Sequence, residues 1–390
     1  MSIPMVDLKA QYASLRDEID AAVKRVIENA QFIGGPELEA FEKELGGWCG
    51  AAYAVGVANG TEALQLALLA CGIKPGDEVV TTPFTFIATA EAITQCGAVP
   101  VFCDIEPQTY NLDPQLIEAK ITPLTRCILP VHLYGHPADM GPIMETAKKH
   151  GLKVIEDCAQ ALGAAYSSPV IARSPQVTRQ SDEHSARQSR VGTFGDAGCL
   201  SFFPSKVLGA YGDGGMVVTG DAAVAESLRM LRNHGARRKY YHEVPGFNSR
   251  LDGLQAAVLR VKLRHLDDWI RQRRRVAALY AKYLGEIPCV TAPYEAPGSY
   301  HCYNYYTVRL KSGSDRAALQ KSLSEKGVSS MVYYPVSLHL QTVYAGQGGK
   351  KGDFPVSERA QDEVLSLPIY PEMTEEQVKQ VAEAVKQATN

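Results

Sequence analysis

Short β-rich runs alternate with helical patterns from about residue 53 to residue 220, and this alternation leaves few folds open to the chain. The β-rich runs occupy 54–58, 78–81, 99–104, 127–131, 153–157 and 215–219. Stretches with helical spacing of apolar residues, such as 63–70 and 139–149, separate them. Strand and helix in alternation predict an α/β fold, with a largely parallel sheet and helices on both faces. In such a sheet the ligand site lies at the carboxyl ends of the strands.

The sequence changes character after about Leu251. The later elements are a long Arg-rich helical pattern (254–280), a strand-like run (305–310), a helix from Asp315 to Lys326 and a last helix from Thr374. We expect residues 1–250 to form a large domain and residues 251–390 a smaller α+β C-terminal domain.

Residues 167–189 do not fit the α/β pattern. They are rich in Ser, Arg and Gln and have almost no apolar periodicity, although they interrupt a dense α/β region. This composition predicts an inserted mobile loop.

The balance of charge excludes several classes of partner. Lys and Arg number 40 against 43 Asp and Glu, a net charge of −3, so no long-range field would attract nucleic acid or an acidic membrane surface. Nine cysteines without a C-x-x-C pair, several of them in apolar runs, indicate a reducing compartment. No apolar stretch approaches the roughly 18 to 20 residues of a membrane span. We expect a soluble, cytoplasmic protein that holds any anionic ligand by local contacts.

Three features at the ends of predicted strands are candidates for a common site. The turn 59–61 (Asn-Gly-Thr) follows one strand and opens a helix, so its amides and hydroxyl suit an anion. Asp157 ends an apolar strand, and Lys206 lies between Phe202-Phe203 and a glycine-rich loop. Taken singly, these features also suit an ordinary helix cap, a capping acid and a solvated surface charge.

Together the three features suit the binding and the chemistry of pyridoxal phosphate. This cofactor needs a lysine amine for a Schiff base, a carboxylate that keeps the pyridine nitrogen protonated, and a helix end with hydroxyls for its phosphate. A free lysine has a pKa of about 10.4, so burial or a cationic neighbour must make its amine available at neutral pH. The aromatic pair Phe202-Phe203 would supply part of that desolvation.

Seven short motifs carry a family resemblance. They are IPMVDL (3–8), GGPE (34–37), ANGTEAL (58–64), PFTFIAT (83–89), EDCAQ (156–160), SFFPSK (201–206) and FNSRLD (247–252). In this order they resemble the DegT-like nucleotide-sugar aminotransferases, within the fold type I (aspartate aminotransferase) superfamily of pyridoxal phosphate enzymes. The resemblance covers nearly the whole chain except residues 167–189. It implies a fold type I architecture in which the large domain binds the cofactor.

The resemblance also implies roles for individual residues. Lys206 would form the Schiff base and then move the proton between the substrate carbon and the cofactor, and Asp157 would pair with the pyridine nitrogen. Gln160 would lie near the cofactor's 3-hydroxyl, and Phe86 would stack on its ring. The phosphate would be held at Gly60 by the Thr61 and Glu62 amides, the Ser201 hydroxyl and, from a neighbouring subunit, Asn248. The contact from the neighbour implies a homodimer with shared active sites.

The implied reaction takes an amino group from glutamate and gives it to a keto group of a nucleotide-linked sugar, in amino-sugar biosynthesis for a surface polysaccharide such as lipopolysaccharide or for a glycosylated metabolite. Tyr333, Tyr334 and His339 fall where relatives that act on 3-keto hexoses or 3-keto uronic acids have substrate-side residues. Tyr333 stands where many of those relatives have a histidine. Arg250 would clamp a carboxylate of the uronic acid or of glutamate, or would form a salt bridge at the subunit interface.

Several alternatives remain open. One is a 4-keto sugar aminotransferase of the same family, and another is a non-catalytic regulatory or binding protein with the same fold. Two other functions are disfavoured. The dehydratase branch of the family has a histidine where this chain has Lys206. A nicotinamide-dependent dehydrogenase would need a G-x-G-x-x-G after its first strand, which this chain lacks. His132 and His136 are four residues apart, but His132 falls on a predicted strand, where this spacing does not converge on a metal, so we expect no metal site.

Overall fold

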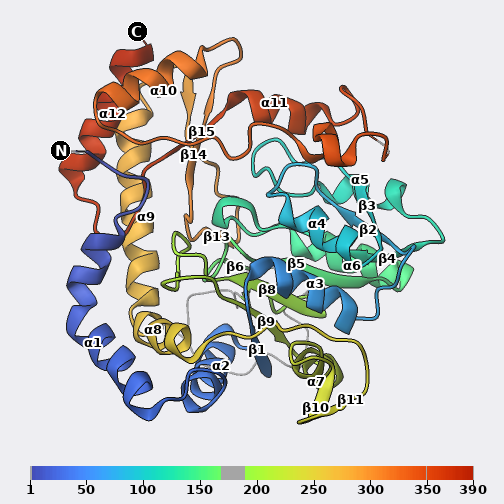
Figure 1. Ribbon diagram of the computed structural model, residues 1–390. Helices are drawn as coiled ribbons and strands as arrows, with labels where there is room; N and C mark the ends of the chain where they lie inside the picture. Colours follow the sequence, from blue (N-terminus) through green and yellow to red (C-terminus); the bar gives the residue numbers. More distant parts are fainter. Residues whose placement is uncertain (1, 168–188, 348, 390) are drawn as a thin grey trace.

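The computed structural model describes residues 2–167, 189–347 and 349–389 (Figure 1). Of the segment 167–189, for which the sequence predicts a mobile loop, all but the first and last residues lie outside these ranges.

A seven-stranded sheet forms the centre of the larger part of the molecule (Figure 1). Its order is β1-β9-β8-β5-β4-β2-β3, in which β8, β5, β4, β2 and β3 are parallel while β9 is antiparallel to both β1 and β8. The strands are β1 (Tyr53–Val57), β2 (Glu78–Thr81), β3 (Val99–Phe102), β4 (Thr125–Ile128), β5 (Lys153–Asp157), β8 (Ala197–Ser201) and β9 (Gly215–Thr219). The predicted α/β fold with a mostly parallel sheet is confirmed.

Helices cover both faces of this sheet, because successive strand residues enter different hydrophobic clusters. Val217 packs with α3, α4 and α7, whereas its neighbours Met216 and Val218 pack with α2 and α8. In the same way, Val79 packs with α3 and α4, whereas its neighbour Val80 packs with α5 and α6. The helices are α2 (Pro36–Cys49), α3 (Gly60–Ala70), α4 (Ala88–Gln95), α5 (Pro114–Ile117), α6 (Met140–His150), α7 (Ala222–Leu231) and α8 (Gly253–Leu263).

The C-terminal part has its own core around a three-stranded antiparallel sheet of order β12-β14-β15. Its elements are α9 (Leu266–Leu284), β12 (Val290–Thr291), β14 (Tyr306–Leu310), α10 (Arg316–Glu325), α11 (Pro355–Glu363), β15 (Val364–Leu367) and α12 (Glu375–Thr389). Ile3 joins this core, and its amide donates to the Gly327 carbonyl at 2.7 Å, so both ends of the chain lie on this part (Figure 1). The division of the chain at residue 250 stays a prediction.

Two further packing features complete the frame. Helix α1 (Leu8–Asn29) lies on α8 through a cluster of apolar side chains. A hairpin, β10 (Ala236–Arg238) with β11 (Tyr241–His242), follows α7. Within the described ranges, no helix combines the length and the apolar character that crossing a membrane requires.

A small sheet joins the described residues that precede and follow 168–188. Its order is β13-β6-β7, formed by β13 (Ser299–Tyr300), β6 (Ala165–Tyr166) and β7 (Ser189–Arg190). Tyr166 pairs directly with Ser189, and the Arg190 guanidinium lies 3.6 Å from the centre of the Trp48 ring and 3.4 Å from Asp267. The chain therefore leaves and re-enters the described structure at adjacent, anchored positions.

Asp104 connects the central sheet to α11. It follows β3 and is buried, and its carboxylate accepts hydrogen bonds from the Val356 and Ser357 amides, both at 3.0 Å, and from the Ser357 hydroxyl at 2.6 Å. These donors lie in the first turn of α11, where backbone amides have no partner within the helix. The carboxylate therefore caps α11 from the other part of the molecule.

Asp104→Ala should lower the free energy of unfolding by about 2–4 kcal/mol, because it leaves several buried donors without an acceptor. The midpoint of urea unfolding, followed by circular dichroism, measures this loss. Asp315→Ala is the matched control, since Asp315 caps α10 at an exposed position through one bond of 2.9 Å to the Ala318 amide. Its loss should cost about 0.5–2 kcal/mol. Equal effects of the two substitutions would contradict the linking role of Asp104.

Candidate active site

The predicted site residues gather at the carboxyl ends of the central strands. Asp157 is the last residue of β5 and Ser201 the last of β8, and these two strands are parallel neighbours. Gly60 begins α3, which packs on the same strands. The α/β topology thus brings together residues from three separate motifs, as the sequence predicts.

The N-terminus of α3 and the Ser201 side chain form a close cradle. A Cβ atom on Gly60 would lie 2.6 Å from Cβ and 3.0 Å from Oγ of Ser201, so only glycine permits this approach. Thr61 lies in the same first turn. Asn59 caps the helix, and its Oδ1 accepts from the Glu62 amide at 2.8 Å. The Glu62 amide, which the resemblance assigns to a phosphate, therefore already has an acceptor within the chain.

The Asp157 carboxylate is enclosed by protein and is only 5% exposed. Oδ2 accepts from the Thr89 hydroxyl at 2.9 Å, and Oδ1 accepts from the Ala159 amide at 3.1 Å. Burial raises the pKa of Asp157, while these two hydrogen bonds and the positive charge of Lys206 oppose the rise. The carboxylate is thus held in one orientation with few of its possible hydrogen bonds made inside the protein.

Lys206 lies in the loop after β8, and its ammonium is 5.7 Å from the centre of the Tyr305 ring. Burial lowers the pKa of this lysine to about 8, although the negative charge of Asp157 acts in the opposite direction. Phe202 instead packs in the core against Phe41, and Phe203 is 53% exposed. The aromatic ring beside the amine is therefore that of Tyr305, which comes from the C-terminal part of the chain.

Gln160, Tyr334 and Phe86 form one side of the site. Gln160 Nε2 donates to the Tyr334 hydroxyl at 2.9 Å, and Gln160 Oε1 accepts from the Tyr134 amide at 2.8 Å. The rings of Phe86 and Tyr334 lie 6.0 Å apart. Phe86 is 53% exposed, which is unusual for a large apolar side chain between buried motifs and suits a ring that faces a ligand.

Two tyrosines that the sequence does not single out, Tyr305 and Tyr134, complete this side by contacting Tyr333. Tyr305 stacks on Tyr333 with 4.2 Å between ring centres, and the Tyr134 hydroxyl donates to the Tyr333 carbonyl. Tyr134 follows β4, whereas Tyr305 and Tyr333 belong to the C-terminal part. No local pattern around Tyr134 or Tyr305 indicates this meeting, since it depends on segments that are far apart in the sequence.

The remaining predicted residues occupy different surroundings. Arg250 is half-buried and, among the described residues, has no hydrogen-bond or ion-pair partner. Asn248 is exposed, whereas its neighbour Ser249 is buried and accepts from the Ala58 amide at 3.2 Å. His339 is buried against Phe354 with Nε2 3.1 Å from Glu358, so its contacts are not with the groups around Lys206. A substrate-side role for His339 stays a prediction.

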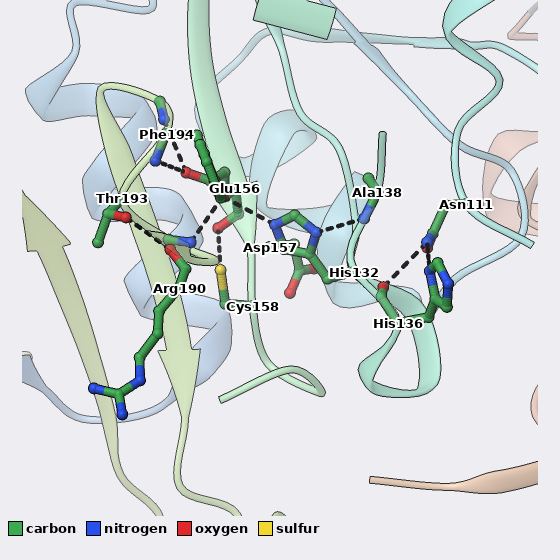
Figure 2. A network of polar contacts seen from close by, with 12 residues as sticks. Asn111, His132, His136, Ala138, Glu156, Asp157, Cys158, Arg190, Thr193 and Phe194 are labelled. Atoms are coloured by element: carbon green, nitrogen blue, oxygen red, sulfur yellow. Dashed lines mark hydrogen bonds and ion pairs between the residues drawn. The ribbon is translucent and has the colours of Figure 1, made fainter. Parts of the chain in front are cut away.

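A network of polar contacts lies directly behind Asp157 (Figure 2). His132 Nδ1 accepts from the Ala138 amide at 2.9 Å, so Nε2 carries the proton and donates to Glu156 at 3.0 Å. Glu156 also accepts from three backbone amides, those of Gly192, Phe194 and Gly195, at 2.7–2.8 Å. Cys158 brings a third ligand atom close to His132 and Glu156, but both histidine nitrogens and both carboxylate oxygens already have partners. The absence of a metal site stays a prediction.

The DegT/DnrJ/EryC1/StrS aminotransferase family matches residues 13–386. The chain belongs to this family. As an aminotransferase of this family, the protein depends on pyridoxal phosphate, which confirms the predicted cofactor and the predicted resemblance.

Individual relatives of this aminotransferase agree over nearly its whole length. The pleiotropic regulatory protein of Geobacillus stearothermophilus is 46% identical over 99% of this chain and 98% of its own. The UDP-N-acetyl-3-dehydro-alpha-D-glucosamine 3-aminotransferase of Acidithiobacillus ferrooxidans is 46% identical over 99% and 97%. The crystal structure of S. venezuelae DesV in complex with a ketimine intermediate is 44% identical, covers 99% of this chain and 98% of its own, and has a TM-score of 0.91. These similarities confirm the fold type I architecture.

The aminotransferase's own residues fit the cofactor. The cradle between the α3 N-terminus and Ser201, which a Cβ on Gly60 would fill, suits a phosphate. The enclosed Asp157 carboxylate suits a ring nitrogen that carries a proton, and Lys206, whose pKa is lowered by burial, would supply the amine for a Schiff base.

Gly60→Ala should weaken the binding of pyridoxal phosphate at least about tenfold, because the new methyl group meets Ser201 where the phosphate would be held. An absorbance titration of the apo-protein measures the dissociation constant. Gly47→Ala is the control, since Gly47 is exposed on α2 and a Cβ there has no atom within 4 Å. It should bind the cofactor like the unchanged protein. Normal binding by the Gly60 variant would place the phosphate elsewhere.

The rate at which the apo-protein forms a Schiff base with added pyridoxal phosphate should rise with pH to a plateau. The free amine is the nucleophile, so the midpoint should lie near the pKa of about 8 of Lys206. Asp157→Asn should move this midpoint to lower pH, because the negative charge of Asp157 raises the pKa of the lysine. Stopped-flow absorbance measures both profiles. A midpoint close to about 10.4, the value of free lysine, would contradict the burial of this amine.

Proposed function

We propose that the protein transfers the amino group of glutamate to a keto group of a nucleotide-linked sugar, at carbon 3 of a hexose or uronic acid. The observation that carries the chemistry is that Asp157, at the end of β5, and Lys206, in the loop after β8, act on each other's charge in a buried site. Burial lowers the pKa of the lysine and raises that of the aspartate. Burial moves the amine toward its free form and leaves the carboxylate with few partners, and both states are needed in one site.

The substrate class is supported by the relatives. The name of the Acidithiobacillus ferrooxidans protein gives a UDP-linked 3-dehydro sugar as the substrate of that enzyme. The match at 46% identity extends over 99% of this chain and 97% of that relative. A position-3 keto sugar is therefore our first choice over the 4-keto alternative.

The chain's own residues have distinct tasks in this reaction. Bound pyridoxal phosphate supplies an electron sink for the carbon next to the amino group. Lys206, with a pKa of about 8, is able both to give and to take a proton near neutral pH, which suits general acid–base catalysis in the two half-reactions. Asp157 holds the positive charge on the cofactor ring, and Gln160 holds Tyr334 at 2.9 Å on the side where Phe86 is exposed.

Arg250 is our candidate for the carboxylate of the amino donor or of a uronic acid. Its guanidinium is half-buried and has no ion-pair partner among the described residues, so it can bind a planar carboxylate through two hydrogen bonds. The same group could instead pair across a subunit interface. Tyr333, whose ring contacts those of Tyr305 and Tyr334, is our candidate for a contact with the sugar.

We also propose a homodimer with shared sites. Asn248 is exposed and is anchored next to Ser249, so it is available to reach the phosphate of a neighbouring subunit. Exposed apolar side chains after α1, namely Phe32 and Ile33, would be covered in such a dimer. A cytoplasmic location and a role in amino sugars for lipopolysaccharide or another glycosylated product complete the proposal.

A regulatory protein is the second candidate, because the Geobacillus stearothermophilus relative is named as one. Such a protein could keep the fold and the cofactor without turnover. The experiment below separates the two functions, since only an enzyme returns from the amino form of the cofactor when a keto sugar is added.

The deciding experiment is a half-reaction assay. The protein is converted with glutamate to its pyridoxamine form and then offered a panel of UDP- and dTDP-linked 3-keto and 4-keto sugars. Return of the visible absorbance with a 3-keto sugar is expected. Return only with 4-keto sugars would shift the assignment to carbon 4, and no return with any sugar would favour the regulatory protein.

Lys206→Ala should retain pyridoxal phosphate through the phosphate cradle but lose turnover by about 10³-fold or more, because it removes both the Schiff base and the proton-transfer group. Borohydride reduction followed by peptide mass spectrometry should find the cofactor on Lys206 in the unchanged protein and on no residue of the variant. Lys321→Ala, which changes an exposed lysine of α10, is the control and should behave like the unchanged protein. Trapping at another lysine would overturn the assignment.

A further inference from the structure

Thr89 is a fully buried side chain that contacts Asp157 from a separate element. It is the second residue of α4, it is 0% exposed, and its hydroxyl lies 2.9 Å from Asp157 Oδ2. Among the described residues, it is the side chain that hydrogen-bonds to this carboxylate, since the other bond comes from the Ala159 backbone. The bond joins residues 68 positions apart in the sequence.

A second buried hydroxyl sets the direction of this contact. Thr85 Oγ1 lies 3.1 Å from Thr89 Oγ1, and Thr85 is 2% exposed. An ionised carboxylate only accepts hydrogen bonds, so Thr89 donates its single proton to Asp157. The Thr89 oxygen then accepts from Thr85. The two hydroxyls form a chain that ends on the carboxylate, and they start next to Phe86.

We propose that Thr89 is a positioning residue that keeps the Asp157 carboxylate ionised and aimed at the ring nitrogen of the cofactor, supported by the hydroxyl of Thr85. The inference rests on the proposed function, in which Asp157 pairs with that nitrogen. A hydrogen bond to the charged form of a carboxylate favours that form, and in a water-excluded site it is worth more than at the surface.

The other charged and titratable groups around Asp157 do not hold its carboxylate through a side-chain hydrogen bond, as Thr89 does. The positive charge of Lys206 favours the ionised carboxylate, but the amine of Lys206 is the reacting group. His132 donates its Nε2 proton to Glu156 and not to Asp157. Tyr334, Cys158 and Cys199 also face Asp157, and burial raises the pKa of each of them, so they are neutral at physiological pH. Burial itself raises the pKa of Asp157, and the fixed hydroxyl opposes that effect whatever the state of Lys206.

The position of Thr85 adds a geometric consequence. Thr85 precedes Phe86, the exposed ring of the site, and Thr89 lies in the first turn of the helix that follows it. The hydroxyl chain therefore holds together the segment that would contact the face of the cofactor ring and the carboxylate that would contact its nitrogen. A shift of one would move the other.

The test compares Thr89→Val with Thr89→Ser in the holo-protein. Valine keeps the shape of threonine and removes the hydroxyl, whereas serine keeps the hydroxyl. The readout is the ¹⁵N chemical shift of pyridoxal phosphate labelled at its ring nitrogen, which reports whether that nitrogen carries a proton, together with kcat and KM. Thr94→Val is the matched control, because Thr94 lies on the same helix and its hydroxyl bonds to the Ala90 carbonyl at 3.0 Å.

We expect Thr89→Val to hold the cofactor on Lys206, to move the ¹⁵N signal toward the unprotonated ring, and to lower kcat about 10-fold to 100-fold with little change in KM. Thr89→Ser should restore both quantities to within about threefold, and Thr94→Val should match the unchanged protein. Thr85→Val should move the ¹⁵N signal in the same direction by a smaller amount, and it decides the matter if Thr89→Val does not fold.

Two results would overturn the inference while the proposed function stands: an unchanged ¹⁵N signal and kcat in the valine variants, or a serine variant that behaves like valine. If the unchanged protein itself carried an unprotonated ring nitrogen or no cofactor on Lys206, the role of Asp157 in the proposed function would fail, and this inference with it. The signal of the unchanged protein therefore distinguishes the two failures.

Discussion

An almost water-free carboxylate at the end of a central strand is the constraint on which the rest of the site depends. Asp157 terminates β5, where burial opposes its charge, and only a few fixed donors compensate. Such a group is costly in a protein interior unless its partners are in place before any ligand arrives. The strand order, the start of α4 and the loop that carries Lys206 all bring a partner to this one position.

Glu156, the residue before Asp157, lies in different surroundings. Glu156 points to the other face of β5, where four donors satisfy its carboxylate completely. Two of its amide donors, from Phe194 and Gly195, lie in the segment that leads into β8. Glu156 thus holds the segment before β8 in place, whereas the Asp157 carboxylate can still accept further hydrogen bonds. Because side chains alternate along a strand, adjacent residues have carboxylates in different surroundings: Glu156 accepts four hydrogen bonds and Asp157 only two.

Much of this arrangement could be predicted from local sequence. Alternating strands and helices, the glycine of the 59–61 turn, and the acid and the lysine at strand ends are each visible in a short window, because each follows from backbone geometry. The surroundings of Lys206 could not be predicted in the same way. Tyr305 and Thr89 reach the site through folding of distant segments, and Phe202 lies in the core although it is close to the lysine in sequence.

The pairing of β6 with β7 fixes the two ends of the chain that runs between them. Because Tyr166 and Ser189 are paired and Arg190 is fixed on Trp48, the chain between them begins and ends at points that do not depend on its length. For a flexible chain between two fixed ends, the entropic cost of closure grows slowly, by about 0.6 kcal/mol for each doubling of length. If such a flexible chain joined these two anchored positions, a change in its length would alter the closure entropy only slightly.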